Sequence, residues 1–444
     1  MYLIYSLLLS AAFLLMLPIF AIRRRKYLTG ALERLGKYGA FVTDGRPVIW
    51  VHCVSVGEVK AALSLIKALR KESPASRIIV SVVTRTGREV AESVFQNLAD
   101  RIFYFPLDFR FAVRSAFKTF KPSAVLLTET EIWPRFIYEA RKLKIKIAVV
   151  NGRISRRSFR NYLSLGRLIT GTFSSLDLAL MQTEEDRQRI TALGCREEKA
   201  FVTGNLKFDA LHLQPNTQPA IEIRSSLEPD RPVIVAASTH YPEEAIFLDA
   251  VRPLVSRFAT AARRPIIVIA PRHPERFEAV AELMQTFAAE CGLYFKRRSL
   301  LPTSYASADL ILLDTIGELA AIYPAAEIVF VGGSIIPHGG QNVLEPAAAG
   351  KPIITGPFTH NFDLVVKEMV AAEALIRIEP EHSEANYSTA LRNAIESLLY
   401  SSHQAGSLGS NARNYLTSRS GRSTAETVRL LRENAIISPS PSRN

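Results

Sequence analysis

Cysteine is scarce in this chain of 444 residues, and so are the short motifs that mark several large enzyme classes. Its three cysteines, Cys53, Cys195 and Cys291, show no C-x-x-C spacing, which excludes a disulfide framework and a typical zinc site and favours a reducing compartment. The sequence also lacks H-E-x-x-H, G-x-S-x-G, G-x-G-x-x-G, a Walker loop and a D-x-D after a strand. These absences disfavour metal-dependent, hydrolase, dehydrogenase and P-loop functions.

What the chain does contain is a large apolar fraction and an uneven charge. Hydrophobic residues make up 48% and charged residues 22%, which excludes disorder, and the length predicts two domains. Residues 1–215 hold 34 Lys and Arg against 18 Asp and Glu, whereas residues 216–444 hold 21 against 24. The first half is therefore expected to meet an anionic partner, which could be phospholipid, a phosphorylated substrate or nucleic acid.

The amino end has the composition of a membrane anchor. Residues 1–22 carry no charge and are long enough to cross a hydrocarbon core of about 30 Å, and Arg23–Lys26 follow at once. The positive-inside rule then places the rest of the chain on the cytoplasmic side of the membrane. A cleaved signal peptide is the alternative, although its positive charges should come first. Pro18 leaves open a helix that lies in the membrane, with residues 23–45 as a basic connection beside the headgroups.

The remaining chain predicts two α/β domains. Strand-like and helical patterns alternate in residues 46–210 and again in residues 233–437, which is typical of parallel, doubly wound sheets. Residues 211–232 contain several prolines and little periodicity, so we expect a linker there. A returning helix should close the second domain, and residues 438–444 should form a disordered tail.

Glu58 is the first candidate for chemistry. An apolar strand pattern over residues 48–56 stops at Gly57, and an amphipathic helical pattern follows, so Glu58 lies on a strand-to-helix turn. In open α/β sheets ligands bind beyond the carboxyl ends of the strands, where such a carboxylate would lie. The alternative is that Glu58 only stabilises the start of a helix.

Three further clusters follow strands of the first domain. Glu129 and Glu131 belong to T-E-T-E-I-W-P, and they could either act in a site or lie in a first helical turn. The four arginines within residues 153–160 could be a solvated face, although the planar guanidinium suits phosphate. Lys207 lies on another turn after a strand.

The second domain offers candidates for nucleotide binding. Residues 332–340 are rich in glycine and precede a helix predicted to start near Asn342, so backbone N–H groups and the helix N-terminus could receive phosphate. Glu345, one turn later, could accept hydrogen bonds from ribose hydroxyls. Arg272 follows another strand, and His273 beside it could be an ordinary loop histidine.

Seven motifs in this order resemble the 3-deoxy-D-manno-octulosonic acid (Kdo) transferases of lipopolysaccharide assembly. They are VSVGEV, TETEIWP, NGRIS, TGNLKFD, PRHPER, DTIGEL and GGSIIPHGGQNVLEPAAAGKP. The resemblance implies a GT-B architecture of two facing Rossmann-like domains. It also implies an inverting transfer of Kdo from CMP-Kdo to the lipid A precursor, lipid IVA, at the inner membrane. Neither a metal nor a cofactor is expected, and nucleic acid is not an expected partner.

The resemblance also implies roles for individual residues. Glu58 looks like the general base, and Glu129 and Lys207 look like stabilisers of the transition state. The residues that look like CMP contacts are Pro271, Arg272, Ile316, Gly317, Glu318, Asn342, Val343, Leu344 and Glu345. Gln341 and Val343 flank Asn342, and they depart from the His-Asn-Pro pattern that the resemblance would imply. Two alternatives remain, a GT-B enzyme that uses a UDP-sugar and a non-catalytic, membrane-anchored protein that binds polyanions.

Overall fold

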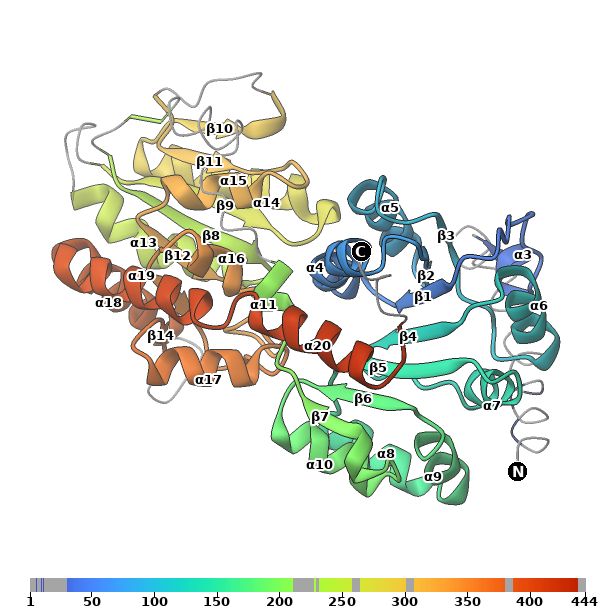
Figure 1. Ribbon diagram of the computed structural model, residues 1–444. Coiled ribbons are helices and arrows are strands. Elements are labelled where there is room, and N and C mark those ends of the chain that lie inside the picture. Colours follow the sequence, from blue (N-terminus) through green and yellow to red (C-terminus); the bar gives the residue numbers. More distant parts are fainter. Residues whose placement is uncertain are drawn as a thin grey trace. The chain divides into compact units, whose positions relative to one another are not determined.

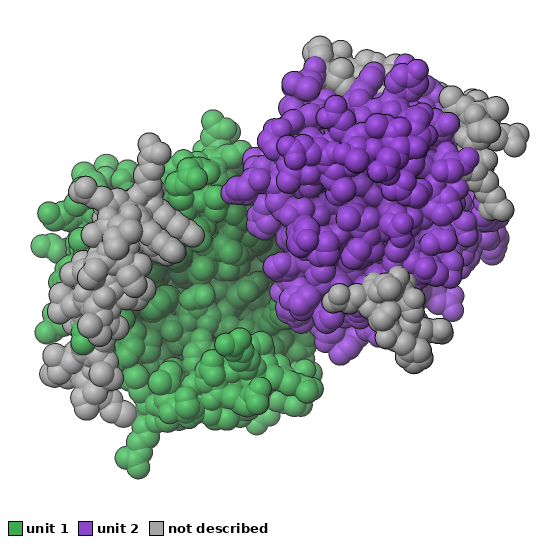
Figure 2. Space-filling model, turned by 180° about the vertical axis from the view of Figure 1, so that it is seen from behind, with its two compact units in different colours: residues 1–210, 420–444 green, residues 211–419 purple. Residues whose placement is uncertain are grey.

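The chain divides into two compact units in the computed structural model. Unit 1 comprises residues 1–210 and 420–444, and unit 2 comprises residues 211–419 (Figure 2). The residues that the structure describes are 30–210, 227–228, 231–257, 264–300, 307–379 and 386–437, with Tyr5, Leu9 and Ala11 from the amino end. Most of the predicted anchor, most of the predicted linker and the whole predicted tail lie outside these residues. Among the described helices, none is both long and apolar enough to span a membrane.

Unit 1 is built on a seven-stranded sheet with the strand order β3-β2-β1-β4-β5-β6-β7, and its neighbouring strands pair in parallel. Its strands are β1 (Val48–Cys53), β2 (Arg77–Val82), β3 (Arg101–Tyr104), β4 (Ala124–Thr128), β5 (Lys146–Gly152), β6 (Leu178–Met181) and β7 (Ala200–Val202). Every residue of β1 is buried, as expected for a central strand with both faces covered. The predicted parallel α/β sheet is confirmed in this unit.

Helices connect these strands, and buried side chains form two hydrophobic clusters. The helices are α3 (Ala31–Arg34), α4 (Val56–Glu72), α5 (Arg85–Val94), α6 (Arg110–Phe120), α7 (Pro134–Lys142), α8 (Arg156–Ser164), α9 (Arg167–Phe173), α10 (Glu184–Ala192), α11 (Lys207–Ala210) and α20 (Arg422–Glu433). Trp50 of β1 has no exposed surface and packs on five phenylalanine rings, so the strand before Glu58 is firmly held.

Unit 2 repeats this plan with the strand order β10-β11-β9-β8-β12-β13-β14, again paired in parallel. Its strands are β8 (Val233–Thr239), β9 (Ile266–Pro271), β10 (Phe295–Arg297), β11 (Leu310–Leu312), β12 (Ile328–Val331), β13 (Ile353–Thr355) and β14 (Ile376–Arg377). Strand β14 was not predicted, because two residues are too short to give a periodic signal.

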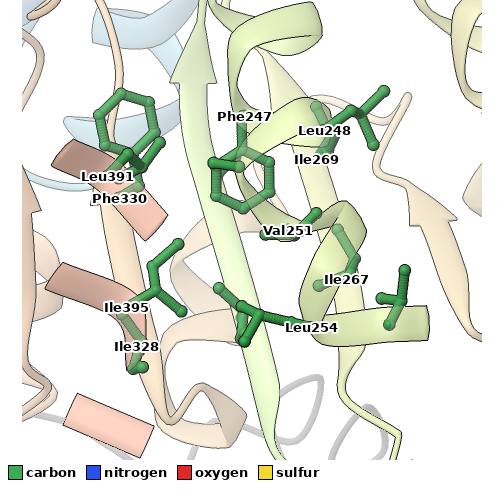
Figure 3. Packing of buried hydrophobic residues seen from close by; sticks show 14 of the residues in the cluster. Phe247, Leu248, Val251, Leu254, Ile267, Ile269, Ile328, Phe330, Leu391 and Ile395 are labelled. Atoms are coloured by element: carbon green, nitrogen blue, oxygen red, sulfur yellow. The ribbon is translucent and has the colours of Figure 1, made fainter. Parts of the chain in front are cut away.

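Apolar residues from several helices of unit 2 share one buried cluster with residues of this sheet. The helices are α13 (Glu243–Arg257), α14 (Phe277–Cys291), α15 (Leu319–Ile322), α16 (Leu344–Ala348), α17 (Asp363–Ala371), α18 (Asn386–Tyr400) and α19 (Ser402–Thr417). Figure 3 shows Phe247 of α13, Phe330 of β12 and Leu391 of α18 in one packed cluster. This core holds the strand ends that carry the predicted nucleotide contacts.

The last helix corrects the predicted domain boundary. The second domain was predicted to run over residues 233–437, but α20, drawn in red in Figure 1, belongs to unit 1. Asp209 accepts hydrogen bonds from the backbone of Gly421 and Thr424, and Thr424 Oγ1 lies 3.0 Å from Ser64 Oγ of α4. These contacts attach the amphipathic α20 to helices α11 and α4 of unit 1.

Each sheet has a topological switch point, where the strand order reverses: the chain adds strands on one side of its first strand and then continues on the other side. In unit 1 this point lies between β1 and β4, and in unit 2 it lies between β8 and β12. The crevice beyond the strand ends at a switch point is the usual ligand site of such sheets. Ligand-binding residues are therefore expected at these two points.

Candidate active-site residues

Glu58 lies at the switch point of unit 1, in the first turn of α4. Ser55 caps this helix, with its side chain accepting from Glu58 N. The carboxylate accepts from Val54 N at 2.8 Å and from Ser55 Oγ at 2.9 Å, and only 7% of the residue is exposed. The helix-stabilising interpretation of Glu58 is thus partly correct, because the residue does complete a capping arrangement.

A second set of contacts gives Glu58 more than a capping role. Burial raises the pKa of the Glu58 carboxyl, and the nearby charge of Glu129 raises this pKa further. Thr128 Oγ1 lies 2.6 Å from His52 O and 2.9 Å from Glu58 Oε2, but a hydroxyl has only one hydrogen to donate. When His52 O receives that hydrogen, Oγ1 can accept a hydrogen bond from the protonated carboxyl of Glu58. The surroundings therefore suit a carboxyl group that takes up and releases a proton.

Glu129 and Lys207 form an ion pair beside this group. Lys207 Nζ lies 3.4 Å from Glu129 Oε1, and each side chain is 27% exposed. Glu129 directly follows β4 with a left-handed φ of 54°, and its N–H donates to Val150 O. Neither Glu129 nor Glu131 lies in a first helical turn, because α7 begins only at Pro134. The helix-charge alternative for these two residues is wrong.

Buried Asn151 explains how Lys207 comes to lie beside Glu129, although the two residues are far apart in the sequence. Asn151 is the penultimate residue of β5 and has a φ of 54°, and its side-chain oxygen accepts from Leu206 N at 2.9 Å. This bond holds the turn before Lys207 against the end of β5. The structure thus brings together Glu58, Glu129 and Lys207 from three distant motifs.

The arginine-rich segment forms an exposed helix. None of the residues of α8 is buried, and Leu163 and Leu165 at its end are 50% and 54% exposed. Arg156 lies 3.7 Å from Glu185, at the long end of the range for an ion pair. The solvated-face interpretation therefore fits the geometry of α8, and it leaves these cations accessible to an anionic surface.

The residues predicted to bind CMP lie at the carboxyl-end edge of the unit 2 sheet. Pro271 ends β9 and Arg272 follows it, exposed and without an ion pair among the described residues. Residues 316–318 follow β11, the neighbour of β9. Ile316 is 83% exposed, and Glu318 forms a two-pronged bond with Arg298, with contacts of 2.8 and 3.0 Å.

Asn342 and Glu345 hold each other in place. Asn342 Oδ1 accepts from Leu344 N and its amide donates to Glu345 Oε1, both at 3.1 Å, while Val343 and Leu344 are buried. The helix that follows, α16, begins at Leu344 and has only five residues. The predicted contacts from residues 342–345 therefore come from a short, internally bonded turn.

One expectation about the glycine-rich loop is wrong. The N–H groups of Gly333, Ser334 and Ile335 all donate to Glu243, at 2.6, 3.0 and 3.2 Å, and are not available for phosphate. Glu243 also accepts from His240 N at 2.9 Å and has no exposed surface. Sequence reasoning missed Glu243, although a signal existed, since each unit places a glutamate shortly after its first strand.

No cluster of His, Cys, Asp and Glu among the described residues is arranged to hold a metal ion. Cationic side chains do gather at the unit 2 edge, where burial lowers the pKa of the His240 imidazole and the nearby charges of Arg276 and Arg272 lower it further. Positive charge for a phosphate is thus present in the side chains themselves.

Comparisons with known proteins place the chain in a family. Residues 29–210 match the family described as 3-deoxy-D-manno-octulosonic-acid transferase (kdotransferase). The 3-deoxy-D-manno-octulosonic acid transferase of Haemophilus influenzae is 32% identical over 391 residues, 88% of each chain. The Bordetella pertussis protein of the same name is 36% identical over 336 residues, 74% of this chain and 76% of its own.

A solved structure supports the fold. A glycosyltransferase from Rickettsia africae is 14% identical, with a TM-score of 0.59 over 88% of this chain and all of its own, and this likeness shows the fold alone. The two parallel-sheet α/β units therefore resemble those of GT-B glycosyltransferases, as the motifs predicted. The chain belongs to the 3-deoxy-D-manno-octulosonic acid transferase family and is a Kdo glycosyltransferase of lipopolysaccharide biosynthesis.

Proposed function

We propose that this enzyme transfers Kdo from CMP-Kdo to the lipid A precursor, with inversion at the anomeric carbon and without a metal or cofactor. The observation that carries the proposal is Glu58, a nearly buried carboxyl with a raised pKa at the switch point of unit 1. Its proton chemistry matches the need to activate a sugar hydroxyl. Unit 1 serves the acceptor in this proposal, and unit 2 serves the nucleotide.

The reaction then follows in one displacement. Glu58 takes the proton of the acceptor hydroxyl while the hydroxyl oxygen forms a bond to the anomeric carbon of Kdo. The bond from that carbon to the phosphate oxygen breaks, and its electron pair leaves with CMP. Lys207, held beside Glu129, stabilises charge near the reacting atoms, and Arg272 offsets the charge that develops on the phosphate.

Asn342, Glu345 and residues 316–318 complete the donor site in this proposal. The Asn342–Glu345 pair fixes polar groups next to a short helix, and the carboxylate of Glu345 suits ribose hydroxyls. Glu318, oriented by Arg298, presents a second carboxylate at the same sheet edge. The remaining assigned contacts, Pro271, Val343 and Leu344, would supply backbone and apolar surface.

The enzyme works at the inner membrane in this proposal, with residues 1–22 as its anchor and phospholipid as a partner. The basic excess of residues 1–215 and the exposed arginines of α8 suit an anionic lipid surface. Tyr5, one of three described residues in the apolar stretch, donates to Asp108 Oδ2 at 2.8 Å.

Mass spectrometry of the lipid product tests the proposal. The full-length enzyme in detergent is incubated with lipid IVA and CMP-Kdo, and a product heavier by whole Kdo units is expected. The same reaction with EDTA should proceed at the original rate. UDP-sugars in place of CMP-Kdo should give no product, and transfer from a UDP-sugar instead would contradict the donor assignment.

A further inference from the structure

Three histidines gather at the switch point of unit 2. His240 follows β8, His273 follows β9, and His338 lies in the loop after β12; these three strands are neighbours in the sheet. The ring centroids of His240 and His273 are 5.2 Å apart, and those of His240 and His338 are 4.6 Å apart. The loops after three neighbouring strands thus each place one imidazole in the same cluster.

The loop beside them has few backbone donors to offer. Besides the three N–H groups that Glu243 accepts, Gly340 N donates to Gly333 O and Gln341 N donates to Gly332 O. In many nucleotide-binding loops backbone N–H groups hold the anion. Those N–H groups are already bonded here, so they cannot hold an anion at this edge. Side-chain donors are therefore needed in place of these five N–H groups.

His240 itself is not the group that meets a ligand. It is only 6% exposed, and its Nε2 lies 3.2 Å from the Gln341 side-chain nitrogen, which can only donate, so this ring nitrogen is unprotonated. Burial, followed by the charges of His338, His273, Arg276 and Arg272, lowers the pKa of His240 to about 4. His240 is a neutral spacer between two exposed rings.

The two exposed rings, His273 and His338, keep accessible nitrogens. Arg272 is exposed next to His273, whereas Arg276 is bound to Glu244 at 2.9 Å. An imidazole N–H from each side and one guanidinium make a donor set suited to the oxygens of a phosphate. Such a donor set suits a phosphate better than a neutral sugar.

We propose that His273 and His338 bind the phosphate of the nucleotide donor and stabilise its charge as the bond to the sugar breaks. This inference rests on the proposed function, because it takes the nucleotide to be CMP. It adds two contacts from β9 and β12 to the assigned CMP residues. The cytosine and ribose are left to residues 316–318 and 342–345.

Binding of CMP and of cytidine by the full-length enzyme separates the phosphate from the rest of the nucleotide. In the double variant His273→Ala/His338→Ala, the Kd for CMP should rise about 10-fold or more, since hydrogen bonds to a charged group are lost. The Kd for cytidine should not change. His403→Ala is the matched control, because His403 is an exposed imidazole on α19, and it should bind both ligands as the unchanged enzyme does.

The other outcomes are equally informative. An equal loss of cytidine binding would overturn the inference, because the variant would then disturb the site as a whole. Unchanged CMP binding with a raised KM for CMP-Kdo would also overturn it, and would assign the two rings to the carboxylate of the sugar. Failure of the unchanged enzyme to bind CMP at all would instead refute the proposed function.

Discussion

Glu58 and Glu243 occupy corresponding places in the two units, each in the first turn of the helix that follows the first strand. Glu58 has one backbone N–H and two hydroxyls as hydrogen-bond partners and keeps 7% of its surface exposed. Glu243 accepts from four backbone N–H groups and has no exposed surface. Burial raises the pKa of both carboxyls, but the four N–H groups oppose that rise at Glu243.

One position in a repeated fold thus serves two purposes. Hydroxyl partners can reverse their hydrogen bonds when a carboxyl gains a proton, whereas backbone N–H groups can only donate. Glu58 can therefore change its protonation state without leaving a donor unpaired. Glu243 instead links the glycine-rich loop to the start of α13. Its replacement should therefore lower the stability of the fold more than it lowers the catalytic rate.

Replacing the catalytic candidate is expected to have the largest effect. Glu58→Gln should lower kcat for transfer from CMP-Kdo by about 10²- to 10⁴-fold, the usual contribution of a general base. Its thermal unfolding should change little, because Gln keeps an oxygen for the Val54 N–H. The measurement is initial rate together with a melting curve.

Glu131→Gln is the matched control, a carboxamide placed in the loop beside Glu129. It should keep activity within about 3-fold of the unchanged enzyme, since no proton transfer is assigned to it. An unaltered rate for Glu58→Gln would remove the base from the mechanism.

The counterpart in unit 2 should lose stability instead. Glu243→Gln turns one acceptor oxygen into a donor that faces backbone N–H groups, which should cost about 2 to 4 kcal/mol of unfolding free energy. Denaturant unfolding measures this cost, with exposed Glu275→Gln as the control that should change stability by less than about 0.5 kcal/mol. A fully stable Glu243→Gln enzyme would show that the loop does not depend on this carboxylate.

The smallest predicted effect concerns the pH profile of unit 1. Glu58 must be ionised to take a proton, so the rate should fall as the pH drops through its pKa. Glu129 raises that pKa, and Glu129→Gln should therefore move the acid-side fall of kcat/KM to lower pH. Glu243→Gln should leave this fall where it was. A shift to higher pH in Glu129→Gln would mean that Glu129 does not act on Glu58 through its charge.

Much of the fold could be predicted from the sequence, because its strands are strongly apolar and their turns carry distinctive polar motifs. Residues 124–128 and 328–331 are continuous apolar or β-branched runs of the kind that parallel sheets bury. The placement of α20 could not be predicted, since an amphipathic pattern does not state which sheet it will cover. The short strand β14 carried no signal at all.

The site was predicted less completely, for a physical reason. Glu58 and Lys207 could be predicted as site residues because each is a charged residue on a turn after a strand. The structure brings both together with Glu129. Whether loop N–H groups face a ligand or an internal carboxylate depends on contacts across about 90 residues, as between Glu243 and Gly333. No local pattern encodes such a contact, and so the sequence suggested a phosphate-binding loop that is already occupied.

The return of the chain to unit 1 at residue 420 makes unit 2 an insertion within unit 1. Unit 2 can be expressed as one continuous segment, whereas unit 1 needs two segments rejoined by an artificial linker. A carboxyl-terminal truncation before α20 would therefore damage unit 1, although unit 1 is encoded mainly by the first half of the chain. Unit 2, which directly precedes α20 in the sequence, would stay intact.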